Sequence, residues 1–451
     1  MDIKLLLTKI FVLLLFSSGL NAQQSGLLSK DDVSYLEALT KAVLDSSRIL
    51  PGQLISKDFG PNTTGGTLIR PGGRDCYPAF WIRDYAMSLE SGMISGKEQK
   101  HMLHLAAATQ CDQTFITKNG SLVPAGAIAD HIRIDDGQPI YFPGTYDFEE
   151  QGNKIYGMTP PYDDQFFFIH MAYFYVSTTR DIQFLLNDVN GIRLTDRLET
   201  AFKVPPSRKD NHIVYSTDDY RGVDFGFRDA IVLTGDLCFS SILKFRAAKE
   251  LAEIFGLVHD QSKAVKYREI AEKIRKSIPG LFLDQRGMLL ASTGKSRQPD
   301  VWATALAVYL GVLEEGIQKK TCQFLADAYK KGILAHHGNI RHILTIDDYN
   351  HSTAWEVTSV EKNTYQNGAY WGTPTGWVCF AIARAHLPLA RKLAKEYIAD
   401  LRINDFRKGI GFGGPFECFY PPGYQQNPVY LTTVSCPYAV FKSSPDLHQG
   451  P

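Results

Sequence analysis

The chain of 451 residues has no excess of charge of either sign, because Lys plus Arg and Asp plus Glu each number 48. A balanced chain exerts no net field on a polyanion, which argues against nucleic acid as a partner and favours a neutral ligand. After the first 22 residues, no stretch is long and apolar enough to cross a bilayer. We therefore expect no membrane span in the mature protein.

Cysteine is scarce, and no two cysteines form a C-x-x-C pair. An odd number leaves at least one thiol free, so we expect buried free thiols rather than a disulfide scaffold. The seven positions are Cys76, Cys111, Cys238, Cys322, Cys379, Cys418 and Cys436. The chain also lacks an H-E-x-x-H motif, a Gly-rich phosphate loop and a G-x-S-x-G elbow. The motifs typical of zinc peptidases, nucleotide-binding enzymes and serine hydrolases are therefore missing. We expect neither cofactor nor metal.

The first 22 residues are typical of a secretory signal peptide, with Lys4 and Lys9 before the apolar run at residues 10–16. Cleavage after Ala22 would leave residues 23–451 as one catalytic domain. We expect an exported, monomeric protein. The short signal, followed by Gln23-Gln24, favours a bacterial periplasm.

Helical patterns dominate the rest of the chain and come in pairs, with apolar residues recurring at spacings of three and four. The expected helices cover residues 31–48, 85–94, 97–111, 164–177, 180–202, 234–255, 259–277, 300–313, 317–330, 376–385, 388–401 and 428–441. Ser29 is a possible cap for the first, and Pro279-Gly280 is expected to end the seventh. Twelve helices in hairpins predict an all-α (α/α)6 barrel, with long loops and minor β-structure at the active-site end. The inner helices should be apolar nearly all round.

Two carboxylates lie in aromatic settings far apart in sequence: Asp224, before Phe225 and Phe227, and Glu417, after Phe416. Such a pair suits an inverting glycoside hydrolase, in which one acid protonates the leaving oxygen and the other activates water. The flanking rings would raise the pKa of Asp224 by desolvation, whereas Arg228 would lower it. The rivals are Asp229 for the acid and Glu356 or Glu361 for the base.

Two long loops are rich in aromatic, Gly and polar residues, at residues 71–85 and 365–377. Aromatic faces pack on pyranose rings, while Arg and Asp bind vicinal hydroxyls. A third segment, Pro161-Tyr162-Asp163-Asp164-Gln165, offers Asp164 and Gln165 as sugar ligands, with Ca²⁺ binding or a helix cap as alternatives.

Five segments, in order, resemble signatures of the trehalase and processing α-glucosidase families of glycoside hydrolases. Pro71-Gly72-Gly73-Arg74 with Trp81 resembles the first trehalase signature, and Trp371 to Trp377 resembles the second. Thr159-Pro160-Pro161-Tyr162 is similar to a Q-P-P-F segment, Asp224 to Arg228 to D-F-x-x-R, and Phe416-Glu417 to the Phe-Glu of the general base. Trp81-Ile82-Arg83-Asp84 and Tyr365-Gln366-Asn367-Gly368 also resemble glucoamylase motifs.

The resemblance implies a six-hairpin barrel, an inverting mechanism without metal, Asp224 as general acid and Glu417 as general base. The sugar contacts that it implies are Arg74, Trp81, Arg83, Asp84, Arg228, Gln366, Asn367, Trp371 and Trp377.

The departures from the trehalase pattern fall on substrate recognition. Ile82 and Gly372 replace the Asp of the two signatures, and neither the Arg-Pro-Glu-Ser segment nor the C-terminal Gly-rich loop has a counterpart. We therefore expect an exo-acting enzyme on another α-linked glycoside, with an α-glucoside first. α-L-Rhamnosides and unsaturated uronides are rival substrates. A catalytically silent carbohydrate-binding barrel is the alternative function.

Overall fold

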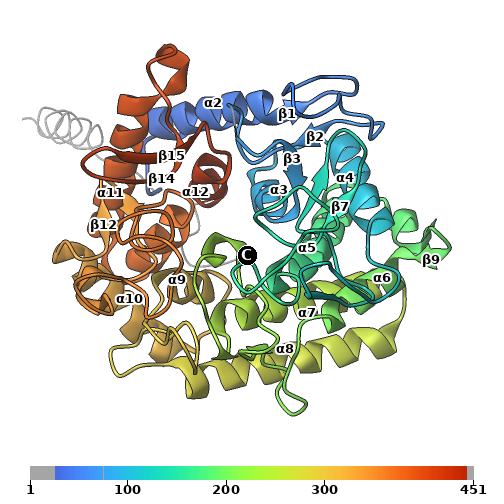
Figure 1. The fold of residues 1–451 in the computed structure, drawn as a ribbon. Helices are drawn as coiled ribbons and strands as arrows, with labels where there is room; N and C mark the ends of the chain where they lie inside the picture. The colour runs from blue at the N-terminus through green and yellow to red at the C-terminus, as the bar shows by residue number, and fades with distance from the viewer. Residues whose placement is uncertain (1–25, 75, 444–451) are drawn as a thin grey trace, which may run out of the picture.

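Helices form the body of the molecule in the computed structural model, which describes residues 26–74 and 76–443. They come in antiparallel pairs and close into a ring (Figure 1). The predicted signal peptide, residues 1–22, lies outside the described residues.

Six helical segments form the inner ring. They are α3 (Ile82–Ser88), α5 (Tyr162–Thr179), α7 (Cys238–Leu257), α9 (Val301–Tyr309), the first part of α11 (Thr375–Asn404) and α12 (Thr432–Lys442). Each contacts the next, and α12 contacts α3, which closes the ring. Every residue of α3 and α9 is buried, as expected for helices covered on both sides.

The outer layer consists of α2 (Lys30–Ser47), α4 (Gly96–Ala108), α6 (Leu194–Lys203), α8 (Gln261–Phe282), α10 (Glu315–Lys330) and the second part of α11. These helices bury a single stripe; in α8 it includes Ala264, Tyr267, Ala271, Ile274 and Ile278. Two concentric layers of six confirm the predicted (α/α)6 barrel.

Local sequence chemistry explains several helix ends. Ser29 caps α2, since its Oγ accepts a hydrogen bond from the Asp32 N–H at 3.1 Å. α11 joins the two helices predicted at residues 376–385 and 388–401, and the joint is a kink at His386, where φ is −152°. The break falls two residues before Pro388, whose ring disfavours helix in the residue before it.

Several helix predictions were wrong in extent, including 85–94, where α3 ends at Ser88, and 300–313, where α9 ends at Tyr309. Residues 180–202 are not one helix: they contain the 3₁₀ turn η2 (Ile182–Leu186), a hairpin of β8 (Asp188–Val189) and β9 (Ile192–Arg193), and then α6. α8 runs past Pro279 to Phe282, and the Leu283 N–H closes its last turn on the Pro279 carbonyl. α12 begins at Thr432 rather than 428, because β15 continues to Pro428 and Val429 takes a positive φ of 61°.

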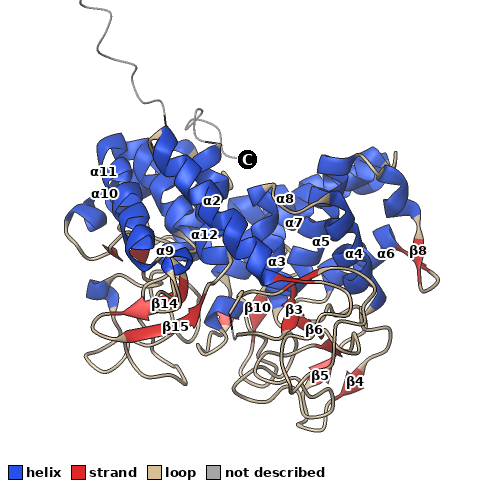
Figure 2. Cartoon of the chain, turned by 90° about the horizontal axis from the view of Figure 1, so that it is seen from above, coloured by secondary structure: helices blue, strands red, loops and turns tan. Residues whose placement is uncertain are grey.

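The connecting loops and most of the strands gather at one end of the barrel (Figure 2). The strands are short antiparallel pieces: β1 (Arg48–Ile49) with β2 (Leu68–Ile69), β3 (Ala79–Trp81) with β6 (His131–Arg133) and β7 (Pro139–Ile140), β4 (Phe115–Ile116) with β5 (Leu122–Val123), β10 (Tyr215–Ser216) with β11 (Gly235–Asp236), β12 (Ala335–His336) with β13 (Asn339–Ile340), and β14 (Phe416–Tyr420) with β15 (Tyr424–Pro428). Three further 3₁₀ turns are η1 (Leu89–Ser91), η4 (Thr345–Asp347) and η5 (Phe406–Lys408).

All seven cysteines are free thiols within the described residues, six of them buried, which confirms the expected absence of a disulfide scaffold. Across residues 26–74 and 76–443, no helix has the length and apolar character needed to span a membrane.

Candidate active site

A cavity of about 240 Å³ opens at the loop end of the barrel. Its walls come from the start of α3, the 3₁₀ turn η3 (Gly226–Arg228), the loop at residues 359–365 and the hairpin of β14 and β15. The lining residues are Tyr77, Trp81, Arg83, Asp84, Gly144, Tyr156, Gly226, Phe227, Asp229, Ala230, Ser359, Val360, Tyr365, Glu417, Gln426 and Tyr430. Three carboxylates and a wall of aromatic rings therefore face one pocket, which we call the loop-end pocket.

Glu417 lies on β14 and is 1% exposed. Its Oε2 accepts hydrogen bonds from the Asn427 amide at 2.5 Å and the Tyr77 hydroxyl at 3.2 Å, while Oε1 has no partner among the described residues. Burial, together with the charges of Asp84 and Asp229, raises the pKa of Glu417 to about 8, although its two donors act in the opposite sense. Glu417 is thus an oriented carboxyl with one free oxygen.

Asp229 follows η3 and lines the same pocket. Its Oδ1 accepts a hydrogen bond of 2.8 Å from the amide of Gln366, which also accepts the Ala230 N–H through Oε1. Burial raises the pKa of Asp229 to about 6, while Gln366 and Arg83 act to lower it. Because the charge of Asp229 is one cause of the raised pKa of Glu417, a proton on Asp229 favours ionisation of Glu417.

Asp84 is the third carboxyl of the pocket. Its Oδ1 accepts a hydrogen bond of 2.7 Å from the hydroxyl of Tyr430, and burial raises the pKa of Asp84 to about 6. It stands beside Arg83 at the start of α3.

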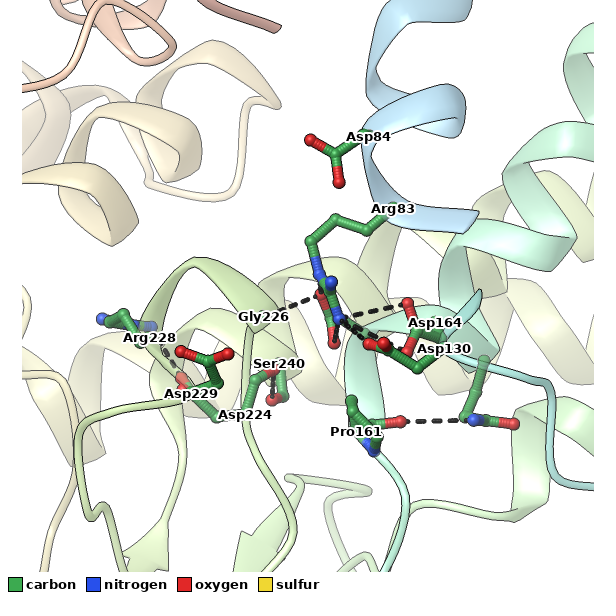
Figure 3. Close-up of polar contacts among 12 residues, drawn as sticks. Arg83, Asp84, Asp130, Pro161, Asp164, Asp224, Gly226, Arg228, Asp229 and Ser240 are labelled. Atoms are coloured by element: carbon green, nitrogen blue, oxygen red, sulfur yellow. Dashed lines mark hydrogen bonds and ion pairs between the residues drawn. The ribbon is translucent and has the colours of Figure 1, made fainter. Parts of the chain in front are cut away.

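Asp224, the residue that the resemblance implies as acid, does not line this pocket. Its Oδ2 accepts a hydrogen bond of 2.6 Å from Arg228, whose other nitrogen pairs with Asp300, and its backbone oxygen accepts the Ser240 hydroxyl. Burial raises the pKa of Asp224 to about 6 against the effect of Arg228, so desolvation outweighs the ion pair. In Figure 3, Asp224 and Arg228 form one group, while Arg83 and its carboxylates form another.

Arg83 joins the pocket to three buried carboxylates behind it. Its Nε lies 2.7 Å from Asp163, and its Nη2 lies 2.9 Å from Asp130 and 3.3 Å from Asp164. This cluster fixes the guanidinium in place (Figure 3). The position of the guanidinium also explains why residue 226 is a glycine, since a Cβ added there would lie 1.7 Å from the Arg83 Cζ.

The aromatic wall is built around Trp81, which stacks on His131 with ring centroids 4.1 Å apart. Tyr77 packs edge-on against Trp81 at 5.3 Å, so the ring that binds Glu417 also supports the indole. Trp81 Nε1 is buried without a hydrogen-bond partner among the described residues. The wall thus offers apolar faces beside the carboxylates.

Of the residues expected to contact sugar, Trp81, Arg83 and Asp84 line the loop-end pocket, and Gln366 binds Asp229. The others lie away from its surface. Arg74 donates to the Phe412 carbonyl, Asp164 pairs with Arg83, and Gln165 bonds the backbone of Ile128 and Pro161. Asn367 accepts from the Ala354 N–H, Trp371 is fully buried against Phe227 and Trp302, and Trp377 lies in the inner part of α11.

Several pocket residues were absent from the sequence-based set, notably Tyr77, Tyr156, Tyr365 and Tyr430. Asn427, which binds Glu417, was absent too. Tyr77 and Tyr365 lie inside the two loops singled out for aromatic content, and both take positive φ, of 53° and 41°. Tyr430 and Asn427 had no comparable signal. Within the described residues, no group of His, Cys, Asp and Glu is arranged to hold a metal ion.

No protein-family model and no curated protein sequence matches the chain. Solved structures match most of its length. A rhamnosidase from Klebsiella oxytoca with rhamnose bound is 13% identical over 92% of this chain and 64% of its own, with a TM-score of 0.54. The chain has the six-hairpin glycosidase fold.

Two further matches span nearly the whole of the compared chain. A glycosidase in complex with glucose is 13% identical over 93% of this chain and 99% of its own, with a TM-score of 0.55. A mannosylglycerate hydrolase of glycoside hydrolase family 63 from Thermus thermophilus, in complex with glucose, is 11% identical over 90% and 99%, with a TM-score of 0.54. Since this chain spans only 64% of the rhamnosidase, its barrel corresponds to part of that longer protein.

Proposed function

We propose that the protein is an exo-acting, inverting glycoside hydrolase in which Asp229 and Glu417 form the catalytic pair. The observation that carries the proposal is that these carboxyls line one aromatic pocket and both have a raised pKa, to about 6 and about 8. Asp224, bound to Arg228 outside the pocket, is assigned a positioning role for η3 instead.

Asp229 is the proposed general acid. Burial without a direct cation partner favours the protonated form, and the Gln366 amide orients the group through Oδ1. Asp229 would transfer its proton to the glycosidic oxygen as the bond from that oxygen to the anomeric carbon breaks.

Glu417 is the proposed general base. Tyr77 and Asn427 hold Oε2, so the unpartnered Oε1 is available to accept a proton from water. The resulting attack on the opposite face of the sugar inverts the anomeric carbon. The acid and base then exchange protonation states, and solvent restores them before the next turnover.

Trp81, Arg83 and Asp84 are the proposed contacts of the sugar in the cleavage subsite. The indole face suits the C–H face of a pyranose, and the adjacent Arg and Asp present a donor and an acceptor to vicinal hydroxyls. The pocket volume, about 240 Å³, lies below the roughly 300–1,000 Å³ typical of small-molecule sites, which supports removal of a terminal sugar.

An α-glucoside is the first proposed substrate, because the two matched structures of similar length both hold glucose. An α-L-rhamnoside is the second, favoured by the rhamnose-bound match. We also propose export to a bacterial periplasm, on the basis of the N-terminal sequence, and a monomeric state.

A panel of aryl glycosides tests the proposal. We expect the purified protein to release chromophore from an aryl α-glucoside or α-L-rhamnoside, and proton NMR to show first the anomer opposite to the cleaved linkage. Binding without turnover across the panel would instead support a catalytically silent barrel. Release with retained configuration would contradict the inverting pair.

A further inference from the structure

A second cavity, of about 400 Å³, opens at the end of the barrel away from Asp229 and Glu417. The C-terminal parts of α5, α7, α9 and α12 line it, whereas the loop-end pocket lies at the start of α3. A narrower cavity that shares Glu90, Arg246 and Tyr309 with it continues inward between the inner helices. We call the larger space the far-end cavity.

Its wall contains a compact charged cluster. His170 Nδ1 lies 2.6 Å from Glu250 Oε1, and Arg246 lies 3.8 Å from both Glu250 Oε1 and Glu90 Oε1. His170 and Glu250 are only 3% and 5% exposed. Arg246 also stands over the ring of Phe167, at 5.3 Å from its centroid.

Four polar atoms of this cluster have no hydrogen-bond partner among the described residues: His170 Nε2, Glu250 Oε2, and Nε and Nη2 of Arg246. Buried polar groups in folded proteins are nearly always hydrogen-bonded, so several unpaired polar atoms beside one cavity point to a ligand. Two of these atoms are N–H donors on Arg246, and Glu250 Oε2 is an acceptor. A hydroxyl group satisfies both kinds, because it donates and accepts.

The charges around the far-end cavity disfavour a strongly ionic ligand. Arg246, Lys249 and Lys442 are balanced there by Glu90, Glu250 and Glu253. The helix C-termini add partial negative charge, which disfavours an anion, while the three cations disfavour an amine. The rings of Tyr173, Phe174 and Tyr309 supply apolar faces.

We propose that the far-end cavity binds a neutral polyhydroxylated molecule, a monosaccharide or polyol, through Arg246 and Glu250. This site is separate from the loop-end pocket and does not depend on the hydrolytic activity proposed above.

Saturation-transfer NMR on the full chain with D-glucose and L-rhamnose tests the site. Trp81→Ala weakens the loop-end pocket, so the part of the remaining signal that a far-end substitution removes reports the far-end cavity. We expect Arg246→Met to lower that signal at least ~5-fold. Ser177→Trp, which adds bulk to the cavity lining without changing the charged cluster, should do the same. D-Glucuronate and D-glucosamine, the charged counterparts, should give weaker signals than D-glucose.

Melting temperatures establish that each variant is folded, and Ser177→Trp decides the matter alone if Arg246→Met does not fold. A signal in the Trp81→Ala background that neither substitution lowers would overturn the proposal. Preferred binding of a charged probe would also overturn it.

Discussion

Asp224 and Arg228 form a fully buried ion pair, with 2.6 Å between Oδ2 and Nη2, and neither side chain lines the loop-end pocket. The acid that a D-F-x-x-R resemblance implies is therefore bound to η3 through its Oδ2, and its Oδ1 has no partner among the described residues. Asp229, one residue after Arg228, lines the pocket. Because Asp229 rather than Asp224 lines the pocket, variants of the two residues should behave differently.

Asp224→Asn should act on stability. It replaces a charged acceptor of Arg228 by a neutral one; the lost charge-assisted hydrogen bond and the desolvation cost that Asn avoids act in opposite directions, so the free energy of unfolding should fall by no more than about 2 kcal/mol. Urea denaturation measures this, with kcat/KM of the folded fraction as the companion readout. Wild-type stability combined with a loss of activity above ~100-fold would return the acid role to Asp224.

Gly226→Ala should impair sugar binding, because the new Cβ would lie 1.7 Å from the Arg83 Cζ and force the guanidinium out of its cluster. We expect a raised KM and a lower melting temperature. Gly256→Ala is the matched control: a Cβ there meets nothing within 4 Å, and the helix should gain up to about 1 kcal/mol. Equal behaviour of the two variants would mean that Arg83 tolerates displacement.

Activity should depend on pH as a bell with limbs near 6 and 8. Below about 6 both catalytic carboxyls carry protons, so no base is present; above about 8 both are ionised, so no acid is present. Between the limbs the pair holds one proton, mostly on Glu417 because its pKa is higher, and the reactive form is the minor one with that proton on Asp229. kcat/KM should therefore be highest near pH 7. These limbs belong to the coupled pair. A flat profile from pH 5 to 9 would show that this pair does not govern the reaction.

Substitutions of Trp371 and Trp81, which the resemblance groups together as sugar contacts, should have different effects. Trp371 is fully buried against Phe227 and Trp302, so Trp371→Ala should destabilise the fold by roughly 3–5 kcal/mol. Trp81→Ala should mainly raise KM, because Trp81 faces the pocket. Calorimetry and steady-state kinetics on both variants test the contrast, and an unchanged KM in Trp81→Ala would remove this ring from the sugar site.

The barrel was predictable because helical periodicity is a local signal and the inner helices are apolar all round. The region 180–202 was misread because its apolar spacing suits a helix, while Asn190-Gly191 forms the turn of a hairpin. Both residues take positive φ, of 50° and 76°, which the primed hairpin turns require.

The site was less predictable, because contacts between distant segments decide which side chains line a cavity. Arg83 and Gln366 show this: one is fixed by Asp130 and Asp163, the other bridges Ala230 and Asp229. Only the fold reveals that the buried Arg228 pairs with both Asp300 and Asp224.

The most direct test of the catalytic pair compares Asp229→Asn and Glu417→Gln on glycosides with poor and good leaving groups. Protonation assists only a poor leaving group, so kcat/KM of Asp229→Asn should fall by about 10²–10⁴ on an alkyl glycoside and recover largely on the matching glycosyl fluoride. Glu417→Gln should stay inactive on both, because water activation is needed in each. Near-wild-type activity of Asp229→Asn on the alkyl glycoside, or recovery by Glu417→Gln on the fluoride, would contradict the assignment.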